Sequence, residues 1–258
     1  SNTTGTANVA VGMQSLYNNT TASYNTAVGS SSLYTNTTGN SIVAVGTDAF
    51  YKNTTGNSGT AVGVQAGYNN TTGINNTFIG KSSASSNTTG GYNTALGTDS
   101  LRSNTTANYN TAVGYKAGYS NTTGFDNVAV GRIALNFNTT GNFNTAVGSQ
   151  ALDANTTASS NTAIGYGTLS ANTTGDFNTA LGSTALLKNT TANNNVSVGY
   201  QSLYDNTTGT SNTALGTNAL GNNTTASNNT AVGYQSLLAN TTGYGNTASG
   251  KDAMRLNT

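Results

Sequence analysis

The sequence predicts an all-β protein, a parallel β-solenoid (a β-roll or β-helix) of about 15 coils with 17 residues in each. Three observations predict this fold. The glycine of an Ala-Val-Gly motif recurs every 17 residues from Gly12 to Gly250 without a slip. An Asn-Thr-Thr triplet keeps the same interval from Asn2 to Asn240, and the residues between the triplets follow one pattern. Counted from the Asn of the triplet as position 1, a copy reads N-T-T-[GA]-x-x-N-T-A-V-G-x-x-[AS]-L-x-x, as in 19–35.

The repeat is expected to be extended rather than helical. Helical repeats generally need 30 or more residues to form two packed helices, and glycine, threonine and asparagine are poor helix formers. Positions 7–10 predict a short strand because apolar or β-branched residues alternate there, as in Val43 and Val45. From this alternation we expect positions 8 and 10 to face inward and position 9 to face outward. A second short strand is predicted at positions 13–16, around a leucine such as Leu33.

One 17-residue unit buries too little apolar surface to offset the conformational entropy lost on ordering its backbone. Identical coils must therefore stack, which also places equal side chains in ladders. The prediction is one continuous repeat array over residues 1–258, with 15 copies and no cap at either end. Since 1–5 and 254–258 simply stop within the pattern, we expect the array to belong to a longer fibre.

Composition argues against several functions. Only 6% of residues are charged and the formal net charge is +1, so no basic surface for nucleic acid is expected. No apolar run reaches the roughly 20 residues of a membrane helix. Histidine, cysteine and glutamate are absent and the seven aspartates are scattered along the chain. General acid–base catalysis needs converging groups, so we expect no enzyme activity, no cofactor and no metal.

The stretches N-V-A-V-G (8–12 and 127–131) and N-T-A-V-G (25–29) resemble the head repeats of trimeric autotransporter adhesins. The longer pattern at 229–243 is similar to repeats of bacterial and phage tail-fibre-like surface proteins. The resemblance covers the whole chain. It implies a left-handed parallel β-roll and a place at a cell or virion surface.

The Asn-Thr-Thr triplet also matches the N-glycosylation sequon. Two interpretations remain open: a ladder of stacked asparagines at a turn, or attached glycans. The candidate acceptors are Asn2, Asn19, Asn36, Asn53, Asn70, Asn87, Asn104, Asn121, Asn138, Asn155, Asn172, Asn189, Asn206, Asn223 and Asn240.

Position 9 is alanine in every copy except Phe78 and Ser197. If this position faces outward, its small variation suggests that a neighbouring chain or packed sugar covers it. The predicted chain-packing column is Ala10, Ala27, Ala44, Ala61, Ala95, Ala112, Ala129, Ala146, Ala163, Ala180, Ala214, Ala231 and Ala248.

Aromatic residues recur at three positions. Exposed rows of them could stack on sugars or on another chain, or could shield the edge of the solenoid. Position 16 carries Tyr17, Tyr34, Tyr51, Tyr68, Tyr119 and Tyr204; position 12 carries Tyr115, Tyr166, Tyr200 and Tyr234; position 6 carries Tyr24, Tyr92, Tyr109, Phe143 and Phe177. Thirteen of the 15 charged residues lie at positions 12, 13, 16 and 17, which predicts a tolerant outer edge there.

These patterns predict an extracellular structural fibre that self-associates into a filament and is a candidate for glycosylation. The alternative is a receptor- or carbohydrate-binding adhesin or a phage tail-fibre shaft. Ice binding by threonine rows is a minor alternative, because flat ice-binding arrays need threonines on one strand face, whereas the two threonines of the triplet are adjacent.

Overall fold

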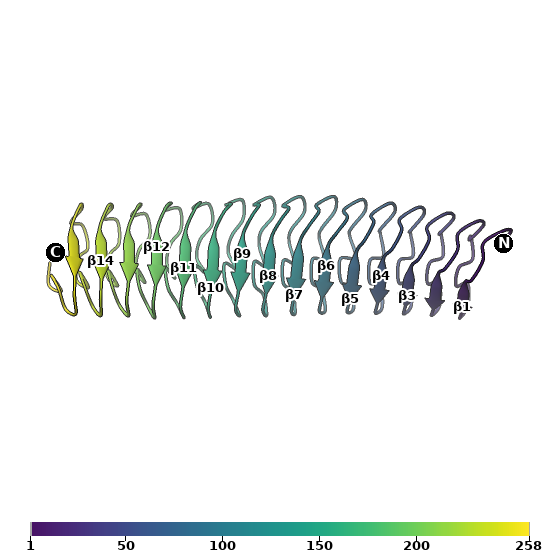
Figure 1. Cartoon of the computed structure of the whole chain (residues 1–258), viewed down its shortest axis with the longest axis horizontal. Helices are drawn as coiled ribbons and strands as arrows, with labels where there is room; N and C mark the ends of the chain where they lie inside the picture. Colours follow the sequence, from purple (N-terminus) through teal and green to yellow (C-terminus); the bar gives the residue numbers. More distant parts are fainter. Residues whose placement is uncertain (1, 258) are drawn as a thin grey trace. The chain divides into compact units, whose positions relative to one another are not determined.

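The computed structural model describes residues 2–257 as a parallel β-solenoid in which each repeat forms one coil with one short strand (Figure 1). The predicted fold class is therefore confirmed. The chain divides into two compact units, Ser1–Asn127 and Val128–Thr258, each described here by itself. The strands of the first unit are β1 (Val9–Val11), β2 (Thr26–Val28), β3 (Val43–Val45), β4 (Thr60–Val62), β5 (Thr77–Ile79), β6 (Thr94–Leu96) and β7 (Thr111–Val113). The strands of the second unit are β8 (Val128–Val130), β9 (Thr145–Val147), β10 (Thr162–Ile164), β11 (Thr179–Leu181), β12 (Val196–Val198), β13 (Thr213–Leu215), β14 (Thr230–Val232) and β15 (Thr247–Ser249).

Within each unit, the strands of successive coils pair in parallel and in sequence order. The register joins each residue to the residue 17 positions later, as in the pair Ala27 and Ala44. Because the period of the sequence equals the length of a coil, the side chains of each repeat position form a column along the stack, and the columns of the constant positions hold identical residues. Some columns make up the core and the others make up the surface.

The strand orientation differs from the expectation, because position 9 faces the interior and positions 8 and 10 face outward. Ala44 on β3 is fully buried, while Val43 beside it is 39% exposed. Alternation along a strand defines two faces but does not say which one is inside. The interior of a 17-residue coil is narrow, since position 9 must share it with the leucine of position 15 and the small residue of position 14, so the smaller side chain lies inside.

This orientation corrects the interpretation of the alanine column. The alanines are covered by their own coils rather than by a second chain or by sugar. The correction applies to Ala27, Ala44, Ala61, Ala95, Ala112, Ala129, Ala146, Ala163, Ala180, Ala214, Ala231 and Ala248, all of which are buried, whereas Ala10 in the first coil is exposed.

The second predicted strand is also absent, because positions 13–16 form turns. In the second coil Ser31 and Leu33 have φ angles of 56° and 50°, and the equivalent residues of the other coils share this left-handed conformation. Such angles cost roughly 1–2 kcal/mol per residue. They are offset by bonds between coils, such as Leu33 N–H to the Ala49 carbonyl (3.0 Å), and by the complete burial of Leu33.

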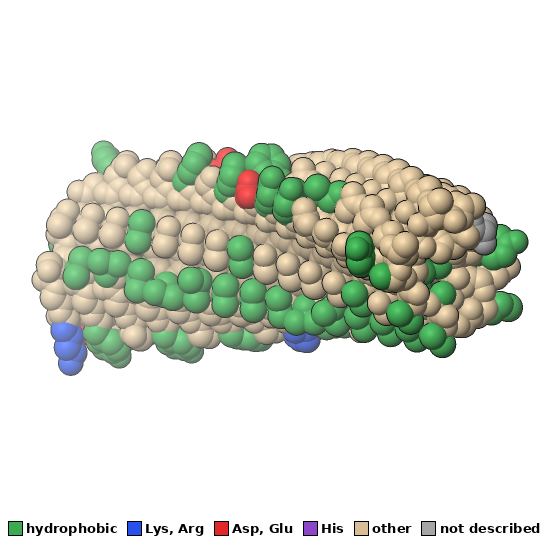
Figure 2. All heavy atoms as spheres, turned by 45° about the vertical axis from the view of Figure 1, so that its right-hand side comes forward, with side chains coloured by type: hydrophobic (Ala, Val, Ile, Leu, Met, Phe, Trp, Pro, Cys, Tyr) green, Lys and Arg blue, Asp and Glu red, His purple; other side chains and the backbone are tan. Residues whose placement is uncertain are grey.

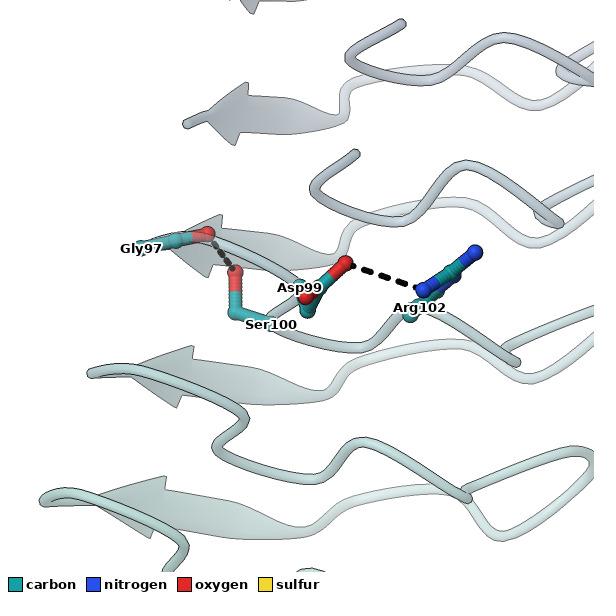
Figure 3. A network of polar contacts seen from close by, with 4 residues as sticks. All are labelled: Gly97, Asp99, Ser100 and Arg102. Carbon is teal, nitrogen blue, oxygen red and sulfur yellow. Dashed lines mark hydrogen bonds and ion pairs between the residues drawn. The ribbon is translucent and has the colours of Figure 1, made fainter. Parts of the chain in front are cut away.

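The turn is braced from inside by position 14 where that residue is serine. The Ser100 hydroxyl donates to the Gly97 carbonyl at 2.9 Å, while Asp99 and Arg102 extend from the same turn (Figure 3). Their side chains form an ion pair of 3.3 Å that is largely exposed on the arginine side. An exposed pair of this kind contributes little to stability, which agrees with the variable composition of this edge.

Candidate functional site

The asparagine of position 1 forms a buried ladder along the stack. In the fourth coil, Asn53 Nδ2 donates to Asn36 Oδ1 at 2.9 Å and to the Gly56 carbonyl at 3.1 Å. The next coil repeats the arrangement with Asn70 Nδ2 and Asn53 Oδ1, also at 2.9 Å. Each amide therefore links two coils and closes a turn in its own coil.

These contacts bear on the candidate glycosylation sites. The 14 asparagines from Asn19 to Asn240 in this column are at most 1% exposed. An N-linked glycan would replace one amide hydrogen and would need access to solvent, but Nδ2 of Asn53 already donates two buried bonds, one to the preceding coil and one within its own. The ladder accounts for this column, and we do not propose glycosylation at these residues. Asn2 in the first coil is exposed and donates to the Gly5 carbonyl.

The two threonines of the triplet have different roles. The hydroxyl of position 2 donates to the carbonyl of the same position one coil later, as Thr37 Oγ1 does to Thr54 O at 3.1 Å. The side chain of position 3 is exposed, as at Thr38. The first threonine is thus part of the hydrogen bonding between coils, and the second forms an outer column.

A second asparagine ladder at position 7 was not predicted. Asn76 Oδ1 accepts a bond from the Asn93 backbone N–H at 2.9 Å, and Asn93 Nδ2 donates to the Ala107 carbonyl at 2.8 Å. The signal was available in the sequence, because position 7 is asparagine in 13 of 15 copies. The exceptions are Ile42 and Gly59, and a Cβ on Gly59 would lie 2.9 Å from the ring of a buried phenylalanine, Phe50.

Phe50 occupies the leucine position of its coil. Its ring centroid lies 5.8 Å from that of Phe78, which replaces the alanine of position 9. Space for both rings comes from Gly67 and Gly59: a Cβ on Gly67 would lie 2.5 Å from Phe50 and 2.8 Å from Phe78. Large residues in one coil are therefore balanced by small ones in its neighbours.

The tyrosines of position 16 stack on one another. Tyr17, Tyr34, Tyr51 and Tyr68 have successive ring centroids 5.1–5.3 Å apart and planes within 6° of parallel. The faces of the inner rings are therefore occupied by neighbouring rings, and only their edges are free. Stacking of sugars on these faces, one of the expected roles, would require the ladder to open.

Titratable groups are dispersed between coils. Burial raises the pKa of the Asp153 carboxyl, and a 2.6 Å bond from the Ser170 hydroxyl partly opposes this effect. Lys188 Nζ lies 2.7 Å from Asp205 Oδ1, and this contact raises the pKa of the lysine. Across residues 2–257 no three metal-binding side chains come together, and no pocket opens.

The outer strand face is the surface formed by the side chains of positions 8 and 10. Position 8 is threonine or valine in every copy, and position 10 is valine, isoleucine or leucine except at Ser249. Its most exposed apolar members are Val9, Val11, Val43, Leu96, Ile164, Leu181, Val196, Leu215 and Val232. Figure 2 shows apolar side chains lined up over successive coils on the surface that it presents. None of the residues in either column is charged.

Comparison with known proteins gives no match: no protein-family model, no curated protein and no solved structure matches this chain. In the described part of the chain, no helix is long and apolar enough to span a lipid bilayer.

Proposed function

We propose that this chain is a structural, non-catalytic segment of an extracellular fibre or filament at a cell or virion surface. The observation that supports the proposal is the use of its polar side chains. The asparagines of positions 1 and 7 and the threonine of position 2 are committed to bonds along the stack, as in Asn53, Asn93 and Thr37. Such residues would carry the chemistry of a binding site, and here they join coil to coil instead.

The mechanism is mechanical. Each coil is held to the next by backbone bonds around its circumference, by the two asparagine ladders and by the threonine column. A load along the stack is then shared by many bonds in each interface between coils, and unfolding of one coil exposes the faces of its neighbours. Because backbone and amide groups are bonded from coil to coil, we expect the chain to resist proteolysis.

Immunogold labelling with an antibody against this chain, applied to intact cells or particles of its source, tests the proposal. We expect gold to lie along extended appendages outside the surface. Label confined to the cell interior, or found only on soluble material in the medium, would refute the structural role.

The alternative of a receptor- or carbohydrate-binding fibre is tested separately with a glycan array. It predicts a bound glycan whose signal is lost when the exposed Tyr166 and Tyr200 are both replaced by alanine. The stacked rings of Tyr34 and Tyr51 favour the structural role, because aromatic platforms that bind sugars present a free face.

A further inference from the structure

The outer strand face has a composition that an isolated surface does not require. Strand propensity accounts for valine and threonine, but it does not account for Leu96, Leu181 and Leu215, which are 43%, 45% and 37% exposed. Nor does it explain why lysine, arginine and glutamine never occur at positions 8 and 10, although they are frequent at positions 12 and 13. The outer edge of the same coils accepts charge and this face does not.

The periodicity of the face restricts what can cover it. Its side chains form two rows that repeat with every coil, about 4.8 Å apart along the stack. A partner can interdigitate with such rows over many coils only if it repeats at the same distance. Another copy of this chain has that period, and the absence of charge removes repulsion between two like faces. Identical side chains meeting in this way form the dry interfaces of paired sheets.

The area available on each unit is that of a weak, repeated contact. A three-residue strand is about 10 Å long, so the seven strands of the first unit offer about 340 Å² and the eight of the second about 380 Å². Paired through the first unit alone, two copies would together bury about 680 Å², and through the second unit alone about 760 Å², the size of a weak contact that gains strength by repetition along a fibre. The threonine hydroxyls of position 8 would be paired across the interface by bonds to each other.

We infer that the outer strand face packs against the same face of a second copy of this chain. The inference rests on the proposed structural role, since a face-to-face pair is a lateral contact within a fibre, but it concerns the isolated chain and is tested there. Contact between chains was predicted for the alanines of position 9; the inference assigns it instead to the neighbouring positions 8 and 10.

The test compares two variants that carry the same added charge. The face variant is Thr111→Lys, Val113→Lys, Thr162→Lys and Ile164→Lys. The control variant is Gln65→Lys, Thr98→Lys, Ser149→Lys and Gln201→Lys, at positions 12 and 13, where other coils already carry lysine or arginine. Circular dichroism checks that both variants keep the β-structure of the wild type, and light scattering after gel filtration gives the mass over a range of concentrations.

We expect the wild type and the control variant to have the mass of two or more chains, and the face variant to have the mass of one. The dissociation constant of the face variant should rise on the order of 100-fold or more, because the four lysines of each copy, eight in the pair, must lose their water in an apolar interface. A wild type that stays a single chain, or a face variant that associates like the control, would overturn the inference. If the wild type stayed a single chain and also changed the shape of growing ice crystals, the inference would be wrong and the outer strand face would bind ice. None of these outcomes depends on the immunogold result.

Discussion

At position 11, two separate requirements exclude every residue but glycine. Gly63 has a φ of +135°, which other residues rarely adopt. A Cβ on it would also lie 2.7 Å from the carbonyl group of Gly80 in the next coil. The column is therefore limited both by conformation and by the close approach of two backbones.

The two requirements can be separated by a matched pair of variants. Gly63→Ala violates both requirements, whereas Gly250→Ala violates only the first, because Gly250 has a similar φ of +123° but no atom within 4 Å of an added Cβ. We expect a lower melting temperature for both variants and a clearly larger loss for Gly63→Ala, because only there must the coils move apart. Equal losses in calorimetry would mean that backbone conformation alone selects glycine.

The buried ladder predicts that the asparagine of the triplet contributes more to stability than the threonine of position 3. Asn53→Ala removes three buried bonds: it leaves the Gly56 carbonyl and Asn36 Oδ1 without this donor, and Asn70 Nδ2 without this acceptor. Unpaired buried groups of this kind cost about 1–3 kcal/mol each. Thr55→Ala, an exposed neighbour in the same triplet, should cost less than about 0.5 kcal/mol. Denaturant melts of the two variants, with hydrogen exchange to locate the opened coils, measure the difference; similar costs would contradict the ladder.

At the scale of the element, a coil is adjusted to its neighbours rather than to a fixed template. The strand supplies the buried side chain of position 9, the turn supplies those of positions 14 and 15, and the three share a narrow interior. Where Phe50 and Phe78 enlarge these side chains, Gly67 makes room for both rings. Compensation between coils is expected in a solenoid, since each repeat contacts only the next ones.

This compensation predicts an energetic coupling between coils. Gly67→Ala should destabilise the wild type, because its Cβ would lie 2.5 Å from the Phe50 ring. The same change should cost less when Phe50→Leu has restored the common residue of that position. A double-mutant cycle should therefore give a coupling of about 0.5–3 kcal/mol. Additive effects of the two substitutions would show that the rings do not fill this space.

At the scale of the whole molecule, the repeat length and the coil length must agree. Removing residues 94–110 deletes one coil and joins equal positions, so the flanking columns stay continuous. Removing residues 94–109 takes away one residue fewer and leaves a coil with an extra residue. An extra residue in a strand reverses the faces of the side chains that follow.

We expect the deletion of 17 residues to fold with a melting temperature close to that of the wild type. The deletion of 16 residues should melt at a lower temperature and show faster hydrogen exchange in the coils around the junction. Indistinguishable melting curves for the two deletions would mean that the coils tolerate slips in register, against the pairing seen in β5 and β6.

The sequence by itself determined the fold class, the 17-residue coil, the strand at Thr26–Val28 and its equivalents, and the asparagine ladder as one of two interpretations. These features follow from local residue preferences and from the period of the repeat, and both can be read from a single sequence. It did not determine that Ala44 faces inward and Val43 outward, or that Leu33 lies in a turn rather than a strand. An alternating pattern defines two faces of a strand but not which of them is inside. Only closure of the coil shows that the interior is narrow and therefore takes the alanine. The tertiary structure therefore decided where the surface lies, and with it which columns are free to meet another chain.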